Sequence, residues 1–175
     1  MNSRAMLAGL AVALCAATPL AAQEHPIQIA LFTPVQIVPE NADVSVLRLN
    51  FIYSVNRSVK YVDLGLVNVT SGGPSEGVQW SFVALNKGSF TGWQASSVAA
   101  VTQGDFEGLQ TAAFTMARKG QGVQWGIVNV AQSWKGLQLG LVNYTQNLHG
   151  LQIGLINIIK TGGVSPVLPI VNWSF

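Results

Sequence analysis

Arg48 and Asp63 are the two charged residues that the sequence places firmly inside predicted strands, and they are the best candidates for a functional site. Both fall on the small, polar side of an alternating pattern. The register predicted below puts them towards opposite ends of adjacent strands. A direct salt bridge is therefore not assured, and each can instead bond with inward Gln or Asn. Such charges either tune ion selectivity or pack the interior, and we favour packing.

A glutamine recurs on that same side of successive repeats, with Gly or another small residue nearby. Amide side chains both donate and accept hydrogen bonds, so facing glutamines are expected to bond one another and leave little room for water. An open arrangement would instead give a narrow, weakly selective pore. The predicted lumen-facing glutamines are Gln79, Gln94, Gln110, Gln124, Gln138 and Gln152.

Catalytic chemistry lacks its usual residues in this chain. The two histidines, His25 and His149, do not belong to a Cys/His/Asp/Glu cluster, and Cys15 is the only cysteine. No Gly-x-Ser-x-Gly, His-Glu-x-x-His or Gly-rich phosphate motif occurs. We therefore predict that the protein is not an enzyme, with no catalytic residue, no metal and no cofactor.

The composition indicates an exported, apolar chain. Among 175 residues, nine are basic, seven are acidic and 49% are hydrophobic. A net charge of +2 without any Lys/Arg-rich run excludes nucleic acid as a partner. Residues 1–22 combine Arg4, a short apolar run and a Leu-Ala-Ala ending, which predicts a secretory signal peptide cleaved near Ala22. The remainder, 23–175, is predicted to form one domain.

The second half of the chain repeats itself every 14 residues, in 122–129, 136–143 and 150–157. Looser copies begin at Gly77, Gly92 and Gly108, and 61–68 fits the same frame. This period indicates one strand plus one turn. The closing asparagines, Asn68, Asn129, Asn143 and Asn157, are expected to start turns. Ten strands follow: 26–37, 45–54, 60–69, 77–85, 92–101, 108–117, 122–130, 136–144, 150–158 and 166–175.

Each predicted strand has one side of large apolar residues and one side of small or polar residues. If the apolar side pointed into a soluble barrel or solenoid, the exterior would carry almost no charge and would be sticky. If the apolar side meets lipid and the polar side faces the barrel interior, the composition of both sides is explained. The pattern therefore predicts an up-and-down antiparallel transmembrane β-barrel of about ten strands in the outer membrane of a diderm bacterium. Strands 92–101 and 108–117 have small outward residues, which indicates an oligomer contact or a misread register.

The turns of such a barrel lie alternately at its two ends, and the charges sort by that parity. Acidic turns near Asp43, Glu76 and Asp105 are predicted to face the outside of the cell. Basic turns near Arg57, Lys87 and Arg118 are predicted to face the periplasm. Most aromatic residues also fall towards one end of the predicted barrel, as in a membrane-interface girdle, although aromatic residues favour the starts of strands as well. The predicted interface aromatics are Tyr53, Tyr61, Trp93, Trp125, Tyr144, Trp173 and Phe175.

The final residues, 167–175, alternate and end on an aromatic. They resemble the C-terminal assembly signal of bacterial outer-membrane β-barrels, which implies the barrel-assembly machinery as a partner. The repeats, with 47–53 and 169–175, resemble an uncharacterised family of bacterial surface-repeat proteins with Gly-Leu-Gln-x-Gly-Leu-x-Asn units. That resemblance implies export and a cell-envelope location but no established activity. Tyr61 and Asp63 depart from the motif by replacing its Gly and Gln.

Two functions are compatible with these observations. The first is an integral outer-membrane barrel with a structural or minor narrow-pore role in the envelope, with the lipid bilayer as its partner. The alternative is a non-membrane, surface-exposed β-solenoid or sandwich, with its Leu, Val and Trp side chains inside, acting in adhesion or assembly.

Overall fold

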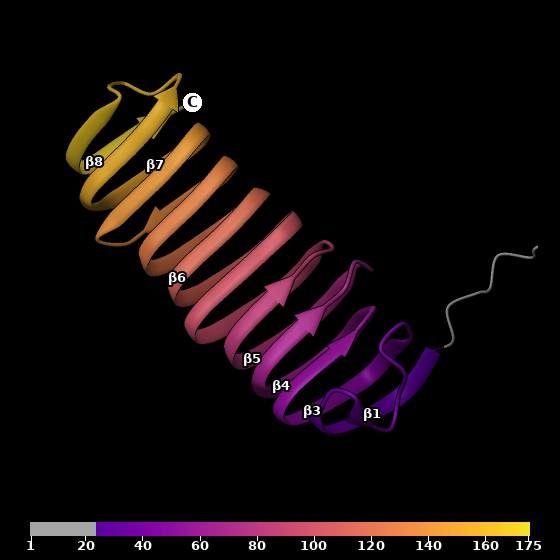
Figure 1. Cartoon of the computed structure of the whole chain (residues 1–175). Helices are drawn as coiled ribbons and strands as arrows, with labels where there is room; N and C mark the ends of the chain where they lie inside the picture. The colour runs from indigo at the N-terminus through magenta and orange to yellow at the C-terminus, as the bar shows by residue number, and fades with distance from the viewer. Residues whose placement is uncertain (1–23) are drawn as a thin grey trace, which may run out of the picture.

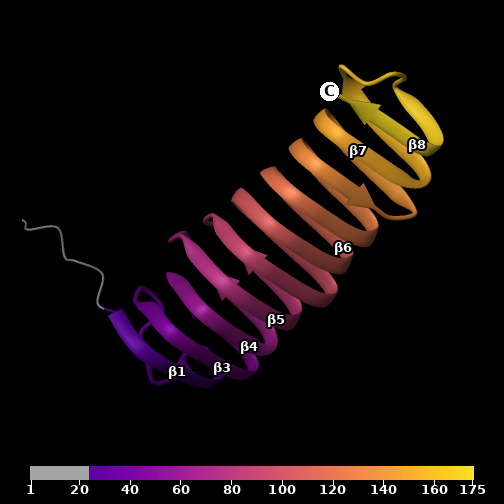
Figure 2. The same ribbon diagram turned by 180° about the vertical axis from the view of Figure 1, so that it is seen from behind.

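The computed structural model describes residues 24–175, which form a β-solenoid of about nine turns. Successive coils stack like the steps of a ladder, and the two ends of the described chain lie at opposite ends of the stack (Figures 1 and 2). The predicted signal peptide, residues 1–22, lies outside the described residues.

One sheet, in the order β2-β1-β3-β4-β5-β6-β7-β8, runs through all of the coils. The longest strand, β6, continues without a hairpin through 50 residues and therefore winds around several coils. The strands are β1 (Glu24–Phe32), β2 (Val35–Gln36), β3 (Asp43–Asn56), β4 (Ser58–Thr70), β5 (Ser75–Asn86), β6 (Phe90–Leu139), β7 (Val142–Thr161) and β8 (Val167–Ser174).

Neighbouring coils pair in parallel and in register. Gly136 lies opposite Gly150 and Gln138 opposite Gln152, so each residue of the repeat stacks on its own counterpart one coil away. The prediction of an antiparallel barrel is therefore wrong, although the all-β class is right. A 14-residue unit with period-2 alternation suits a hairpin strand and a solenoid coil equally well. Stacking like on like adds side-chain ladders that an antiparallel register would break.

Glycine makes the tight stacking of one corner of the coil possible. Six motif glycines have φ between +110° and +149°, a region that L side chains rarely adopt. A Cβ added to any of the last five would collide with the carbonyl oxygen of the stacked glycine in the preceding coil. The repeat therefore needs glycine for its backbone conformation and for its close approach. These residues are Gly77, Gly92, Gly108, Gly122, Gly136 and Gly150.

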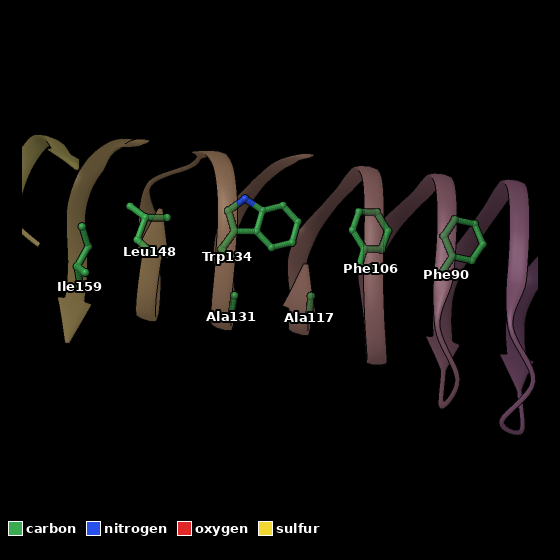
Figure 3. Packing of buried hydrophobic residues seen from close by; sticks show 7 residues of the cluster. All are labelled: Phe90, Phe106, Ala117, Ala131, Trp134, Leu148 and Ile159. Atoms are coloured by element: carbon green, nitrogen blue, oxygen red, sulfur yellow. The ribbon is translucent and has the colours of Figure 1, made fainter. Parts of the chain in front are cut away.

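Stacked aromatic side chains, which we call the aromatic ladder, fill part of the solenoid interior (Figure 3). The rings of Phe90 and Phe106 stack with centroids 6.0 Å apart, and Phe106 stacks on Trp134 at the same distance. In the sequence, Gly120 lies midway between Phe106 and Trp134, and a Cβ added to Gly120 would meet the Trp134 ring. The absent side chain at Gly120 thus makes room for the indole.

Antiparallel strands close both ends of the stack. The short β2 pairs with β1, and β8 pairs with β7, each antiparallel to its neighbour. Proline follows or interrupts these end strands, at Pro34, Pro39 and Pro169. Because proline cannot donate a ladder hydrogen bond, it blunts an exposed sheet edge. The ends are therefore poor templates for adding a further coil.

Charged residues that the barrel prediction sends to opposite ends lie side by side in the solenoid. The guanidinium of Arg57 forms an ion pair with Asp43, and that of Arg118 lies 3.6 Å from the Asp105 carboxylate. The hydrogen bond from Arg57 to Asp43 raises the pKa of the guanidinium above its ordinary value. The predicted separation of acidic and basic turns is therefore wrong, because adjacent coils bring them together.

Candidate functional site

Arg48 and Asp63 form a buried, two-pronged ion pair. The Arg48 Nε and Nη2 atoms each donate to one Asp63 carboxylate oxygen at 2.7 Å. They are register partners on β3 and β4, so they lie at the same level of the strands rather than towards opposite ends. Arg48 Nη1 also donates to the Val69 carbonyl at 2.8 Å. This set of bonds satisfies a charge pair that burial would otherwise make costly.

Six glutamines continue the column from Asp63 along the solenoid axis. Gln79 Nε2 donates to Asp63 Oδ2 at 2.6 Å, and Gln94 Nε2 donates to Gln79 Oε1 at 2.9 Å. Each later amide donates to the glutamine of the coil before it, with donor–acceptor distances of 2.6 to 2.8 Å. We call this column the amide ladder: Gln79, Gln94, Gln110, Gln124, Gln138 and Gln152, all with 0% exposure.

A second, shorter ladder uses the closing asparagines of the repeats. Asn129 Nδ2 donates to Asn143 Oδ1 at 2.7 Å, and Asn143 Nδ2 donates to Asn157 Oδ1 at 2.8 Å. The same amides donate to backbone carbonyls of the next coil, at Leu139 and Ile153. The expectation that these asparagines start turns is wrong, because they are buried in strands and hold the coils together.

The predicted lumen residues therefore hold one another inside the solenoid. Their donors and acceptors are used in the column, and the interior that they occupy is the packed centre of a coil rather than the bore of a barrel. Gln152 is the exception, because its Oε1 atom is buried and has no hydrogen-bond partner at the C-terminal end of the ladder.

Large apolar side chains cover the outside of the wall that carries the amide ladder. The Leu, Val and Trp side chains that alternate with the ladder glutamines thus lie outside, where the lipid-facing assignment placed them, and the solenoid alternative with these side chains inside needs correction. The most exposed are Leu155, Trp80 and Phe51, at 66%, 65% and 64%, followed by Trp125 at 62%. We call this surface the apolar face: Phe51, Leu66, Trp80, Phe82, Trp93, Trp125, Ile127, Leu141 and Leu155.

The apolar face has a recess of about 730 Å³ near its middle. Small residues form its floor, among them Thr111 and Ala113, and Trp93 and Trp125 stand at its edges. The indole Nε1 of Trp93 donates to Thr111 Oγ1 at 3.3 Å. The recess falls on 92–101 and 108–117, where the sequence indicates an oligomer contact or a misread register.

The predicted interface aromatics do not form one girdle. Trp93 and Trp125 belong to the apolar face, whereas Trp173 and Phe175 lie at the C-terminal end. The Phe175 ring contacts His149 edge to face, with centroids 6.4 Å apart. The remaining three lie on other coils, with Tyr53 and Tyr61 exposed and Tyr144 half-buried.

The opposite wall of the solenoid is polar. Its outward residues stack in a column made of Lys87, Gln103, Arg118, Gln132, Gln146 and Lys160. A hollow of about 430 Å³ lies at the edge of this wall, lined by Asp105, Glu107, Lys119, Lys135 and His149 among others. Acids and bases alternate there without a dominant charge, so the hollow suits no single class of ion.

Residues 24–175 meet the requirements of neither a metal site nor a membrane-spanning helix. No three His, Cys, Asp or Glu side chains gather there as a metal site would require. In the same stretch, no helix has the length and apolar character needed to cross a membrane.

Sequence reasoning missed the aromatic ladder and the shape of the recess. Phe90, Phe106 and Trp134 are separated by 16 and 28 residues, and this spacing is a signal only once coils are known to stack. The recess had a signal in Ala95, Ser97, Thr111 and Ala113, which interrupt a column of bulky residues. Comparison with protein-family models, curated proteins and solved structures finds no match for the chain.

Proposed function

We propose that the protein is a non-enzymatic β-solenoid of the bacterial cell envelope that acts in adhesion or assembly through its apolar face. The observation that carries the proposal is the exposure of that face on a rigid, internally bonded stack of coils. Contiguous apolar patches larger than a few hundred Å² mark interaction sites on proteins. This function is the non-membrane alternative of the sequence-based prediction, with the apolar residues outside rather than inside.

The interior chemistry supports a structural role for the buried polar residues. Arg48, Asp63 and the amide ladder satisfy one another, so they stabilise the stack and leave the outer surface to meet partners. The barrel-assembly machinery, predicted as a partner from the C-terminus, presupposes a closed barrel. Because β8 instead closes the end of a solenoid, the apolar face is the better place to look for a partner.

Fractionation of bacteria that express the full chain tests this function. Ile127→Asp with Leu141→Asp places two charges on the apolar face, and Gln132→Asp places one on the polar wall as a control. We expect the wild type and the control to sediment with cell-envelope assemblies, and the double variant to shift to the soluble exported fraction. Circular dichroism checks that each variant keeps its β structure. Identical fractionation of a folded double variant and the wild type would contradict the proposal.

A further inference from the structure

We propose that the partner of the apolar face is a second copy of the same chain, docked face to face with antiparallel solenoid axes. The inference rests on the proposed function and names its partner. In this dimer the Trp125 ring of each copy fills the small-residue position at Ala95 of the other. The argument depends on the size of the face, on its relief and on the closed ends of the stack.

The apolar face is large enough for a stable dimer. The face spans eight coils, which at about 4.8 Å per strand give a length of about 38 Å, and five extended residues give a width of about 17 Å. Its flat footprint is therefore about 650 Å² per copy. Specific interfaces bury about 600 to 1,000 Å² per partner, so the face lies within that range.

The relief of the face is complementary to itself. One outward column contains, coil by coil, Trp80, Ala95, Thr111, Trp125 and Leu139, three residues after each stacked motif glycine. A two-fold axis parallel to the strands at the level of Thr111 pairs the coil before it with the coil after it. Trp125 then faces Ala95, and Leu139 faces Trp80. Trp125, which borders the recess, thus meets a small residue across the axis, and this contact is repeated by symmetry.

The same axis allows nearly the whole apolar face to be buried in the dimer. Thr111 lies close to the middle of the stack, so the coil of Leu66 faces the coil of Leu155. An axis at either end of the solenoid would leave most of the apolar face in water. The central position therefore buries the largest area, and it also places the recess of each copy over that of the other.

A lipid surface is the main competing partner, and the charges around the face do not favour it. Interfacial membrane-binding surfaces combine an apolar face with a border rich in Lys and Arg. Residues 24–175 contain eight basic and seven acidic side chains, and ion pairs such as Arg118 with Asp105 combine both signs on one wall. The proline-bearing end strands, in turn, make end-to-end stacking of copies unfavourable.

Exchange of the bulky and small residues tests the facing pair. Sedimentation of the purified full chain should show a dimer. Trp125→Ala should weaken it at least ~30-fold, because tryptophans are the strongest interface anchors. Ala95→Trp should weaken it as well, because two tryptophans would then face each other. The double variant restores one large and one small residue at each contact and should recover most of the affinity. Circular dichroism and thermal unfolding confirm that all three variants fold.

Cross-linking locates the axis independently. In a Cys15→Ser background, Ala113→Cys places a thiol beside the axis on each copy, and a short bismaleimide should join the two chains. Gln132→Cys lies on the polar wall, far from the proposed contact, and should give no cross-linked dimer at the same concentration. Failure of the first thiol to cross-link in a sample that sediments as a dimer would overturn the geometry.

The remaining outcomes separate this inference from the proposed function. A monomer that binds phosphatidylethanolamine–phosphatidylglycerol vesicles through Trp125 and Ile127 would overturn the second copy but leave the apolar face as the interaction surface. If Trp125→Ala with Ala95→Trp dimerised no more tightly than either single variant, the proposed facing pair would be overturned. A monomer whose fractionation in cells is also unchanged by Ile127→Asp with Leu141→Asp would overturn both.

Discussion

Arg48 and Asp63 form the N-terminal end of a hydrogen-bonded column that runs through seven coils. Every glutamine of the amide ladder donates towards the N-terminus, and all but Gln152 accept a hydrogen bond from the next glutamine on the C-terminal side. The acceptor at the N-terminal end must therefore be a group without an N–H that would itself need an acceptor. The Asp63 carboxylate is such a group. Arg48 then neutralises the charge from the opposite side, with both bonds at 2.7 Å. The two residues that depart from the glutamine pattern therefore complete it.

Asp63→Asn should destabilise the fold by about 3–5 kcal/mol, because it leaves the guanidinium of Arg48 buried without its counter-charge. Urea unfolding, followed by circular dichroism, measures the free energy of unfolding. The double variant Arg48→Gln with Asp63→Gln extends the amide ladder by two neutral rungs and should recover the stability to within ~2 kcal/mol of the wild type. A double variant less stable than Asp63→Asn would show that the column cannot continue there.

The alternation of the repeats identifies which residues lie inside and which outside. Gln124 and Gln138 are buried and Trp125 is exposed, as their positions in the period-2 pattern indicate. The direction of pairing does not follow from that pattern. A coil and a hairpin strand share the alternation, the length and the polar residues between units. The segregation of charges between alternate turns also suits a barrel, and only three-dimensional stacking shows that Arg118 lies next to Asp105.

The pairing of Arg48 with Asp63 could not be predicted for the same reason. In an antiparallel barrel, the two positions approach opposite ends of adjacent strands. In a parallel register, a separation of 15 residues makes them direct neighbours. The asparagines were misplaced because Asn is typical of turns, whereas a parallel stack of identical residues offers it a ladder of amides. Stacked repeats thus change which side chains meet. The predicted strands 60–69 and 77–85 lie inside β4 and β5, but the predicted turns at 118–121 and 131–135 are wrong, because β6 continues through them.

Gln124→Leu should destabilise the protein by about 2–4 kcal/mol, because it leaves the Gln110 acceptor and the Gln138 donor buried without their ladder partners. Gln132→Leu changes the same residue type on the exposed polar wall and should alter the free energy of unfolding by less than ~0.5 kcal/mol. Urea unfolding of the two variants under identical conditions makes the comparison. Equal effects would mean that the ladder adds no stability.

Gly122→Ala should cost more than ~2 kcal/mol of stability, because the residue has a φ of +119° and the new methyl would meet the Gly108 carbonyl oxygen. Gly72→Ala is the matched control, since a Cβ there has no neighbour within 4 Å. Thermal unfolding should show a clear loss for the first variant and a smaller one for the second. A Gly122→Ala variant as stable as the control would contradict the close stacking of the coils.

Phe106→Ala should destabilise the fold by about 3–5 kcal/mol, because the ring stacks between Phe90 and Trp134 and is almost fully buried. Phe175→Ala removes the same side chain from a site that is 85% exposed, and we expect it to unfold at nearly the wild-type temperature. Differential scanning calorimetry measures both. If the control lost as much stability as Phe106→Ala, burial in the aromatic ladder would not be the cause.

Spin labels at Lys87 and Gln103 test the solenoid itself most directly. The two side chains are exposed, and their preceding residues, Asn86 and Thr102, are register partners on adjacent coils. Adjacent strands are about 5 Å apart, so labels on Lys87→Cys with Gln103→Cys, in a Cys15→Ser background diluted with unlabelled protein, should show strong dipolar broadening. In an up-and-down barrel these positions lie in turns at opposite ends, separated by an apolar band of about 25 Å. Spectra free of broadening, with a distance of that size by pulsed measurement, would contradict the solenoid.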